Sequence, residues 1–226
     1  TETVIVSKEY PTGVAGILIN TSDGSNSIIV YPGASMEITK DEVNSFSKFI
    51  TNSKVFLTQL EVKIDVILHS LKIAKKANCT TILNLAPYKK IITEILTFTD
   101  VLIVNETEFS ELSGIELSLI NEDLDIDAIN SLKLIKSIDL IITLGKRGVL
   151  IFSKGNKTFI AGEKVMAIDT VGAGDCFVGA LGYGILNGKD LLTASKLANK
   201  AASISVIKKG AAVSMPYLKD IPDLYY

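Results

Sequence analysis

The chain has 226 residues, 47% of them hydrophobic and 21% charged, which is typical of a folded globular protein and excludes an intrinsically disordered one. Its net charge of −2 offers no basic surface to nucleic acid or to an anionic membrane. Two cysteines, Cys79 and Cys176, are too few for a disulfide framework and fit no metal spacing. Because the sequence also shows no apolar run of membrane-spanning length and no signal peptide, we predict a cytoplasmic protein.

Periodicity and turn residues predict alternating strands and helices along the chain. Strands are expected at residues 14–19, 27–31, 55–58, 81–85, 101–104, 140–144, 149–152 and 158–160, and a strand-like apolar run ends near Ile168. Helices are expected at residues 39–49, 65–74, 105–114, about 121–136, from the glycine turn at 172–174 through 185, and about 190–207. Thr39 and Asp65 are the expected caps of the first two helices, and His69 is expected on a solvent-facing surface among lysines.

This alternation predicts an α/β protein with a mostly parallel sheet that is covered by helices on both faces. The runs at 14–31 and 149–160 are expected to form hairpins, and residues 1–226 a single domain. In such sheets the ligand site lies at the carboxyl ends of the strands. Several polar residues follow the expected strands and should meet at this edge, namely Glu61, Asn84, Asn105, Glu108 and Thr143.

A glycine turn joins the run ending near Ile168 to the helix that follows, in the stretch Asp169-Thr-Val-Gly-Ala-Gly-Asp-Cys-Phe177. Two glycines allow a tight turn, and the first N–H groups of a helix have no intrahelical partner, so this is a suitable place for a phosphate. A carboxylate at Asp175 would be a poor neighbour for that phosphate but a suitable base for a hydroxyl that attacks it. The alternative is an N-cap aspartate without chemistry.

Two other strand ends carry motifs that are open to two interpretations. Asn105-x-x-Glu108 either caps a helix or places one carboxylate near a hydrated magnesium ion, which prefers few carboxylates and several waters. The segment Thr143-Leu-Gly-Lys-Arg-Gly148 is either an ordinary glycine turn or part of a binding site. Its Lys146 and Arg147 either add charge near a triphosphate or face water.

The string Asp169-Thr-Val-Gly-Ala-Gly-Asp-Cys-Phe-Val-Gly-Ala180 resembles the C-terminal signature of the ribokinase-like (PfkB) sugar kinases. Asn105-x-x-Glu108 and Thr143-Leu-Gly-x-x-Gly148 resemble two further elements of this family, in the same order. The resemblance implies a three-layer α/β/α fold with a small β-hairpin lid at residues 10–34. It also implies ATP-dependent phosphorylation of the 5-hydroxyl of D-ribose, with Asp175 as the catalytic base and with Mg²⁺ and K⁺ as cofactors.

The resemblance also assigns the remaining roles. Gly172, Ala173 and Gly174 would form an anion hole. The positions implied to contact ATP are Asn105, Thr143, Gly145, Lys146, Arg147, Gly148, Gly174 and Asn199. Glu61 and Asp175 would bind the sugar, and Glu108 would bind magnesium through water. The positions implied to hold potassium are Asp169, Val171, Ser205, Lys208, Gly210 and Ser214.

Three questions stay open at this point. Fructose or adenosine could replace ribose as the substrate. The family's first strand and its Gly-Gly sugar-binding element are expected before Thr1 and are missing, so a nucleotide-binding protein without turnover is a further alternative. The partners implied by the resemblance are a small-molecule sugar, ATP and a second copy of the chain bound through the lid, with no nucleic acid and no membrane.

Overall fold

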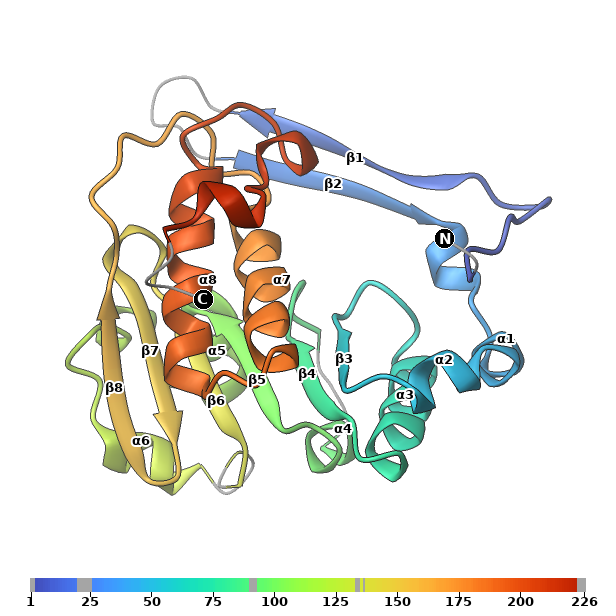
Figure 1. Cartoon of the computed structure of the whole chain (residues 1–226), viewed down its shortest axis with the longest axis horizontal. Coiled ribbons are helices and arrows are strands. Elements are labelled where there is room, and N and C mark those ends of the chain that lie inside the picture. Colours follow the sequence, from blue (N-terminus) through green and yellow to red (C-terminus); the bar gives the residue numbers. More distant parts are fainter. Residues whose placement is uncertain (1–2, 20–25, 90–92, 133–134, 136, 223–226) are drawn as a thin grey trace.

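The computed structural model describes residues 3–19, 26–89, 93–132, 135 and 137–222. In the N-terminal part, β1 (Thr12–Ile19) and β2 (Asn26–Gly33) pair antiparallel with Val14 opposite Tyr31, which confirms the predicted hairpin. Its polar loop lies outside the described residues. Figure 1 shows this two-stranded ribbon standing apart from the larger sheet, and hydrophobic side chains such as Ile29 and Val30 are exposed on it.

The described residues also form a six-stranded sheet in the order β3 (Val55–Thr58), β4 (Thr80–Asn84), β5 (Val101–Asn105), β6 (Asp139–Thr143), β7 (Gly148–Ser153) and β8 (Asn156–Ala161). The first four strands are parallel, and β7 and β8 are antiparallel to their neighbours. This confirms the mostly parallel sheet and the second hairpin. The carboxyl ends of β3–β5 therefore lie at one edge, on the side of the ribbon (Figure 1).

Alternate residues of each buried strand enter two separate hydrophobic cores, because successive side chains of a strand point to opposite faces. Leu140 and Ile142 belong to the core under α3 (Ile64–Lys76), α4 (Glu94–Thr97), α5 (Glu106–Ser113) and α6 (Ile126–Ser131). Ile141 belongs to the core under α7 (Ala173–Leu186) and α8 (Leu191–Ser205), which lie in front of the sheet in Figure 1. The three-layer α/β/α arrangement is thus confirmed.

Local sequence signals explain most of the helix boundaries. Thr39 caps α1 (Lys40–Ser45) in a capping box with Glu42, as predicted, but a break at Phe46 separates α1 from α2 (Ser47–Thr51). Asp65 does not cap α3. Lys63 holds that position, and Asp65 lies in the first turn, where its charge suits the helix dipole. His69 is half-buried, with Nε2 2.7 Å from Asn44 Oδ1, and is therefore less exposed than expected.

Two predicted elements are wrong in extent or kind. Of the helix expected at about 121–136, the described residues form only α6, which begins where Asp125 accepts a hydrogen bond from the Asp127 N–H, and residues 133, 134 and 136 lie outside the described residues. Residues 162–172 form neither strand nor helix, although the run ending at Ile168 looks strand-like. Here the N–H groups of Ile168 and Asp169 donate to the Val206 carbonyl after α8 instead of to a strand.

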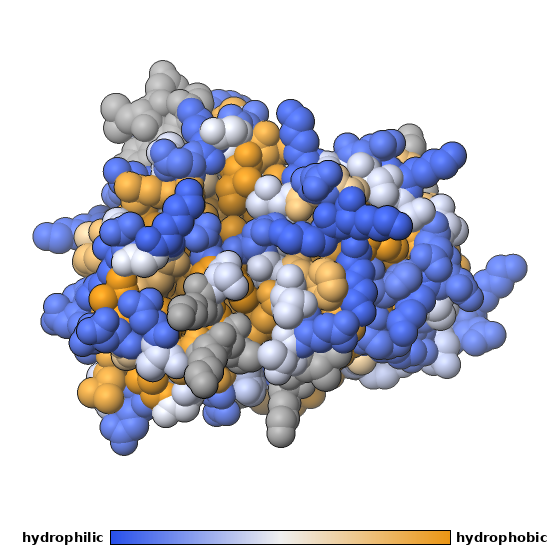
Figure 2. Space-filling view, turned by 90° about the horizontal axis from the view of Figure 1, so that it is seen from below, coloured by the Kyte–Doolittle hydropathy of each residue, from blue (hydrophilic) through white to orange (hydrophobic). Residues whose placement is uncertain are grey.

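Short 3-10 helices complete the fold as η1 (Ala34–Glu37), η2 (Leu117–Leu119), η3 (Gly145–Arg147), η4 (Ala212–Ser214) and η5 (Leu218–Asp220). The face of the molecule seen from below in Figure 1 is covered mostly by hydrophilic side chains, with hydrophobic ones between them (Figure 2). Within the described part of the chain, no helix combines the length and the apolar character that a membrane crossing would need.

Candidate active site

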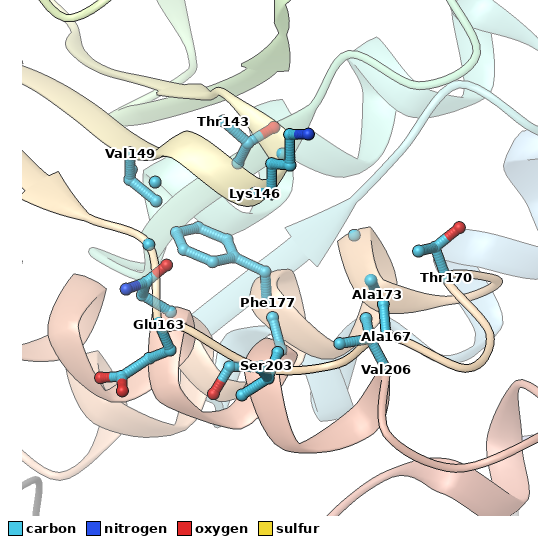
Figure 3. Close-up of a pocket in the computed structure, with 17 residues that line it drawn as sticks. Thr143, Lys146, Val149, Glu163, Ala167, Thr170, Ala173, Phe177, Ser203 and Val206 are labelled. Carbon is cyan, nitrogen blue, oxygen red and sulfur yellow. The ribbon is translucent and has the colours of Figure 1, made fainter.

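A cavity of about 410 Å³ lies where β6 ends, between η3, the segment 162–170, the start of α7 and one face of α8 (Figure 3). The predicted site residues that line it are Thr143, Gly145, Lys146, Gly148, Ala173, Gly174 and Asn199. They come from three separate parts of the chain, so the fold brings together residues that were assigned to ATP from separate motifs. In Figure 3, Lys146 and Thr143 lie across from Phe177 and Ser203.

The turn at η3 takes its shape from glycine. Gly145 has φ +54° and Gly148 has φ +124°, both in the region that L side chains rarely adopt. A Cβ at Gly148 would lie 2.0 Å from the Ile160 carbonyl oxygen, so β8 packs directly against this turn. A Cβ at Gly162, on the opposite strand end, would lie 2.2 Å from the Lys146 carbonyl oxygen. The backbone at this wall of the cavity is therefore close-packed and rigid.

The first turn of α7 has free backbone donors. Gly172 is left-handed with φ +78°, and no side chain of the described residues caps the helix. The Ala173 N–H donates to the Thr170 carbonyl at 3.2 Å, whereas the N–H groups of Gly174 and Asp175 have no acceptor among the described residues. With the helix dipole, these two N–H groups form a site for an anion. The anion hole predicted at Gly172, Ala173 and Gly174 stays a prediction: Gly172 shapes the turn, the Ala173 N–H is occupied, and the free N–H of Gly174 is joined by that of Asp175.

Asp175 lies in the first turn of α7, and its side chain is exposed. Gly174 lines the cavity described above, whereas Asp175 lines a second cavity of about 560 Å³ between α7, α8 and residues 215–221. Asp175 therefore stands at the boundary between two cavities, beside the free N–H groups. A carboxylate in this place can accept a proton from a hydroxyl that approaches an anion bound at the helix end.

Asn105 and Glu108 form a capping box at the start of α5. The Glu108 N–H donates to Asn105 Oδ1 and the Asn105 N–H donates to Glu108 Oε2, both at 2.8 Å. Glu108 is only 8% exposed, and this burial raises the pKa of its carboxyl above the usual value. Oε1 has no hydrogen-bond partner among the described residues. The capping role is thus real, and one carboxylate oxygen is left for another ligand.

The strand register places this helix start next to the first cavity, because Asn105 of β5 lies opposite Thr143 of β6. The site therefore joins a phosphate-sized anion position, an adjacent carboxylate and a cavity with a lysine on its wall. A match to the family model "pfkB family carbohydrate kinase" covers residues 1–218. The chain belongs to the pfkB family of carbohydrate kinases.

Individual relatives support this membership. The ribokinase of Staphylococcus aureus is 39% identical over 222 residues, which are 98% of this chain and 72% of that protein. The ribokinase of Dictyostelium discoideum is 37% identical over 239 residues, covering 97% of this chain and 74% of that protein. A solved structure, Arabidopsis thaliana ribokinase complexed with ribose and ATP, matches with a TM-score of 0.85 at 30% identity and covers 96% of this chain and 70% of that one. The ribokinase-like fold and the phosphotransferase class are thereby established.

Of the residues predicted to hold potassium, Val171 and Gly210 contact Asp169 directly. Its Oδ1 accepts a hydrogen bond from the Val171 N–H at 3.0 Å and its Oδ2 from the Gly210 N–H at 2.9 Å, and these two bonds lower the pKa of its carboxyl. Ser205 and Ser214 are buried, and their hydroxyls donate to backbone carbonyls within their own turns. Lys208 is exposed. The carboxylate of Asp169 thus ties the turn before α7 to the segment after α8. Within the part of the chain that the structure describes, no group of three His, Cys, Asp or Glu side chains could hold a metal ion.

Two predicted residues lie away from the first cavity. Glu61 follows β3 at the same edge of the sheet, but it is exposed and accepts a hydrogen bond from Gln59 Nε2 at 3.2 Å. It lines neither of the two cavities. Arg147 belongs to η3, yet its guanidinium binds Glu106 and Glu122 and is not among the cavity-lining groups. These side chains make other contacts than those the motifs imply.

Ten residues that line the cavity were not among the predicted site residues, although Thr170 and Phe177 lie within the signature stretch 169–180. They are Val149, Gly162, Glu163, Val165, Ala167, Thr170, Phe177, Ala202, Ser203 and Val206. A signal was present for the last three, because they follow Asn199 at intervals of three, four and seven and so share its helix face. Asn199 itself donates from Nδ2 to the Ala161 carbonyl at 3.0 Å, which ties α8 to the end of β8. The irregular segment 162–170 has no comparable pattern.

Proposed function

We propose that this protein is a ribokinase, which transfers the γ-phosphoryl group of ATP to the 5-hydroxyl of D-ribose. The observation that carries the proposal is the start of α7, where two free backbone N–H groups stand beside Asp175 at the boundary between two cavities. The names of the two ribokinases described above, from Staphylococcus aureus and Dictyostelium discoideum, favour ribose over another sugar.

In the proposed reaction, Asp175 accepts the proton of the attacking hydroxyl. The N–H groups of Gly174 and Asp175 stabilise the negative charge on the phosphoryl group that is transferred. A general base typically contributes about 10²–10⁴-fold to the rate, and one preorganised backbone donor about 10²–10³-fold. Because Gly172 holds the turn in the left-handed region before any substrate binds, these donors need no rearrangement during the reaction.

ATP would occupy the cavity of about 410 Å³, with its phosphates near Lys146 and Gly174 and the remainder of the nucleotide towards Asn199 on α8. When bound, Mg²⁺ neutralises charge on the nucleotide phosphates. Glu108 fits such an ion, because Mg²⁺ keeps several waters and needs few carboxylates, and one carboxylate oxygen of Glu108 is left over from the capping box. Asn105 and Thr143, which lie opposite each other on β5 and β6, would contact the nucleotide beside Glu108.

We further propose that K⁺ supports the turn before α7 through Asp169, Val171, Ser205, Lys208, Gly210 and Ser214. The Asp169 carboxylate already links residues 169–171 to residue 210, so an ion beside it would hold the phosphate-binding donors without touching substrate. We expect faster turnover in KCl than in NaCl, and loss of this difference in Asp169→Ala. Full activity without K⁺, or an Asp169→Ala enzyme that K⁺ still activates, would contradict the proposal.

Residues 10–34 would act as a lid through which two copies pair. This proposal is supported by the ribbon of β1 and β2, on which hydrophobic residues of both faces are exposed, including Val14 and Ile29 on one face and Ile17 and Val30 on the other. An isolated two-stranded ribbon is only marginally stable and gains from a partner. Light scattering after size exclusion should give a dimer, and Ile29→Lys should give a monomer.

Sugar specificity is tested by a coupled assay of ADP release with ribose, fructose and adenosine. We expect the highest kcat/KM with ribose. A higher value with fructose or adenosine would favour a different kinase of the same family, and Mg·ATP binding without ADP release for any acceptor would favour the nucleotide-binding alternative. The cytoplasmic location stays a prediction from cysteine usage, and both thiols, Cys79 and Cys176, are buried.

A further inference from the structure

Arg147 is chemically unusual in this chain, because it is the only arginine among 23 lysine and arginine residues. It stands between Lys146 and Gly148, which both line the first cavity, yet its own side chain contacts other parts of the protein. A chain that uses lysine elsewhere has an arginine at this one position. The contacts of the guanidinium explain why a lysine would not suffice.

The guanidinium reaches three acceptors on two segments. Nη2 donates to the carboxylate of Glu106, the first residue of α5, and to the Ile120 carbonyl at 3.1 Å. Nη1 donates to Glu122 Oε2 at 3.3 Å. An arginine presents several N–H groups in a rigid planar fork, whereas a lysine offers one flexible ammonium group. Only the fork can hold α5 and residues 120–122 in fixed directions at the same time.

The backbone of the same residue holds two more segments. The Arg147 N–H donates to the Leu144 carbonyl at 3.1 Å, which closes the η3 turn after β6. Its carbonyl accepts a hydrogen bond from the Gly162 N–H at 2.8 Å, which attaches the end of β8. Arg147 thus connects the turn that lines the cavity with the helix start that carries Asn105 and Glu108.

These contacts favour a geometric role over a stabilising one. The side chains of Arg147 and Glu106 are 36% and 31% exposed, and ion pairs this open to solvent contribute only about 0–1 kcal/mol to folding. Their effect on geometry is larger, because Glu106 directly follows Asn105 in the capping box. A shift of this helix start relative to η3 would change the distance between Glu108, which is proposed to hold magnesium, and the η3 turn, which is proposed to hold the nucleotide phosphates.

We propose that Arg147 is a positioning residue, which fixes the first turn of α5 to the η3 turn so that Mg²⁺ and the ATP phosphates bind in one geometry. This inference rests on the proposed function. It predicts a selective effect on Mg·ATP, because Arg147 contacts neither α7 nor Asp175. The sugar side of the reaction should not depend on it.

The test compares Arg147→Lys with the parent protein in steady-state kinetics, and in calorimetric titration with Mg·ATP without sugar. We expect Arg147→Lys to weaken Mg·ATP binding and to raise its KM by about tenfold, the lower end of the loss that is typical when a group that orients metal ligands is replaced. The KM for the sugar should stay within about twofold, since nothing on that side has changed. Glu122→Gln, which removes only the negative charge from the Nη1 contact, should give a smaller increase, and it serves as a second variant should Arg147→Lys fold poorly.

Lys72→Met is the matched control. It removes an ion pair of similar exposure, Lys72 to Glu94 at 2.7 Å, on the outer helices α3 and α4. It should leave both KM values unchanged. A double-mutant cycle of Arg147→Lys with Glu106→Gln should be non-additive, because both substitutions weaken the same ion pair.

The outcomes separate the two proposals. If the parent protein does not bind Mg·ATP, the proposed function and this inference both fail. If the parent binds Mg·ATP and Arg147→Lys and Glu122→Gln bind it equally well, this inference alone is overturned. A parallel rise of both KM values with a lowered melting temperature would show a merely structural residue and would also overturn it.

Discussion

The starts of α5 and α7 lie at the same edge of the sheet, but side chains cap the backbone N–H groups only at α5. At α5, Asn105 and Glu108 satisfy each other's backbone N–H groups in a capping box. At α7, Gly172 supplies only the turn, and the N–H groups of Gly174 and Asp175 have no acceptor among the described residues. One helix start is closed by its own side chains, and the other is open to a ligand.

The difference shows that two helix starts in one fold can serve different functions. A capped start is rigid and can hold a carboxylate at a fixed place, whereas an uncapped start offers positive potential to an anion. α1 and α8 are also capped by side chains, those of Thr39 and Asp190. α3 also lacks a side-chain cap, but the start of α7 combines free donors with a left-handed glycine and an adjacent carboxylate. Substitutions at the starts of α5 and α7 should therefore have different consequences.

The largest effect is expected for Asp175→Asn at the open helix start. The substitution keeps the size of the side chain but removes the base, so kcat should fall by about 10²–10⁴-fold. The melting temperature should change little, because the side chain is exposed. ADP release and differential scanning fluorimetry measure the two quantities. An unchanged kcat would remove Asp175 from the mechanism.

Gly172→Ala should have the next largest effect. The residue has φ +78°, and a Cβ would lie 3.2 Å from Met215 Cε and 3.3 Å from Ala211 Cβ. The left-handed backbone costs about 1–2 kcal/mol for a residue other than glycine, and a displaced donor should lower kcat by about 100-fold. Gly114→Ala is the control, because Gly114 has φ +76°, open space around it and a place at the far end of α5. It should lose similar stability but no activity, and an equal loss of activity in both variants would contradict the role of the turn.

Asn105→Ala tests the closed helix start. Loss of an N-cap side chain costs about 1 kcal/mol, which corresponds to a fall of about 2–4 °C in melting temperature for a protein of this size. Thr39→Ala removes the same kind of capping box from α1, outside both cavities, and should cost about as much. Only Asn105→Ala should also raise the KM for Mg·ATP. If both variants, or neither, raise it, Asn105 acts as a cap alone.

The smallest effect is expected for the pH dependence of stability at Glu108. Burial raises the pKa of this carboxyl, so the folded protein binds the proton more tightly than the unfolded chain. The free energy of unfolding therefore falls as the pH rises from about 4.5 through the raised pKa, because the buried carboxyl becomes charged there. Below about pH 4.5 this carboxyl does not lower stability. Glu108→Gln keeps a side chain that can serve in the capping box. Urea unfolding should show the variant gaining on the parent as the pH rises from 4 to 7, and a constant difference would contradict this assignment.

The sequence by itself determined the features that depend on neighbouring residues. The continuous apolar run of strands such as Val101–Asn105, the capping box at Thr39 and the glycine turn at Gly172 each depend on a few neighbouring residues, so they could be recognised without the fold. The same holds for Asn105 and Thr143, whose positions at the ends of expected strands predicted the edge of the sheet at which they meet.

Only the tertiary structure decided features that depend on distant partners. The run ending at Ile168 has the composition of a strand, but its N–H groups donate to Val206 and it lines a cavity wall instead. Arg147 lies in a nucleotide motif, but carboxylates 25 and 41 residues away turn its guanidinium from the cavity. Local composition sets what a segment can form, and partners far along the chain decide which of those possibilities is realised, because hydrogen bonds and ion pairs depend on distance in space.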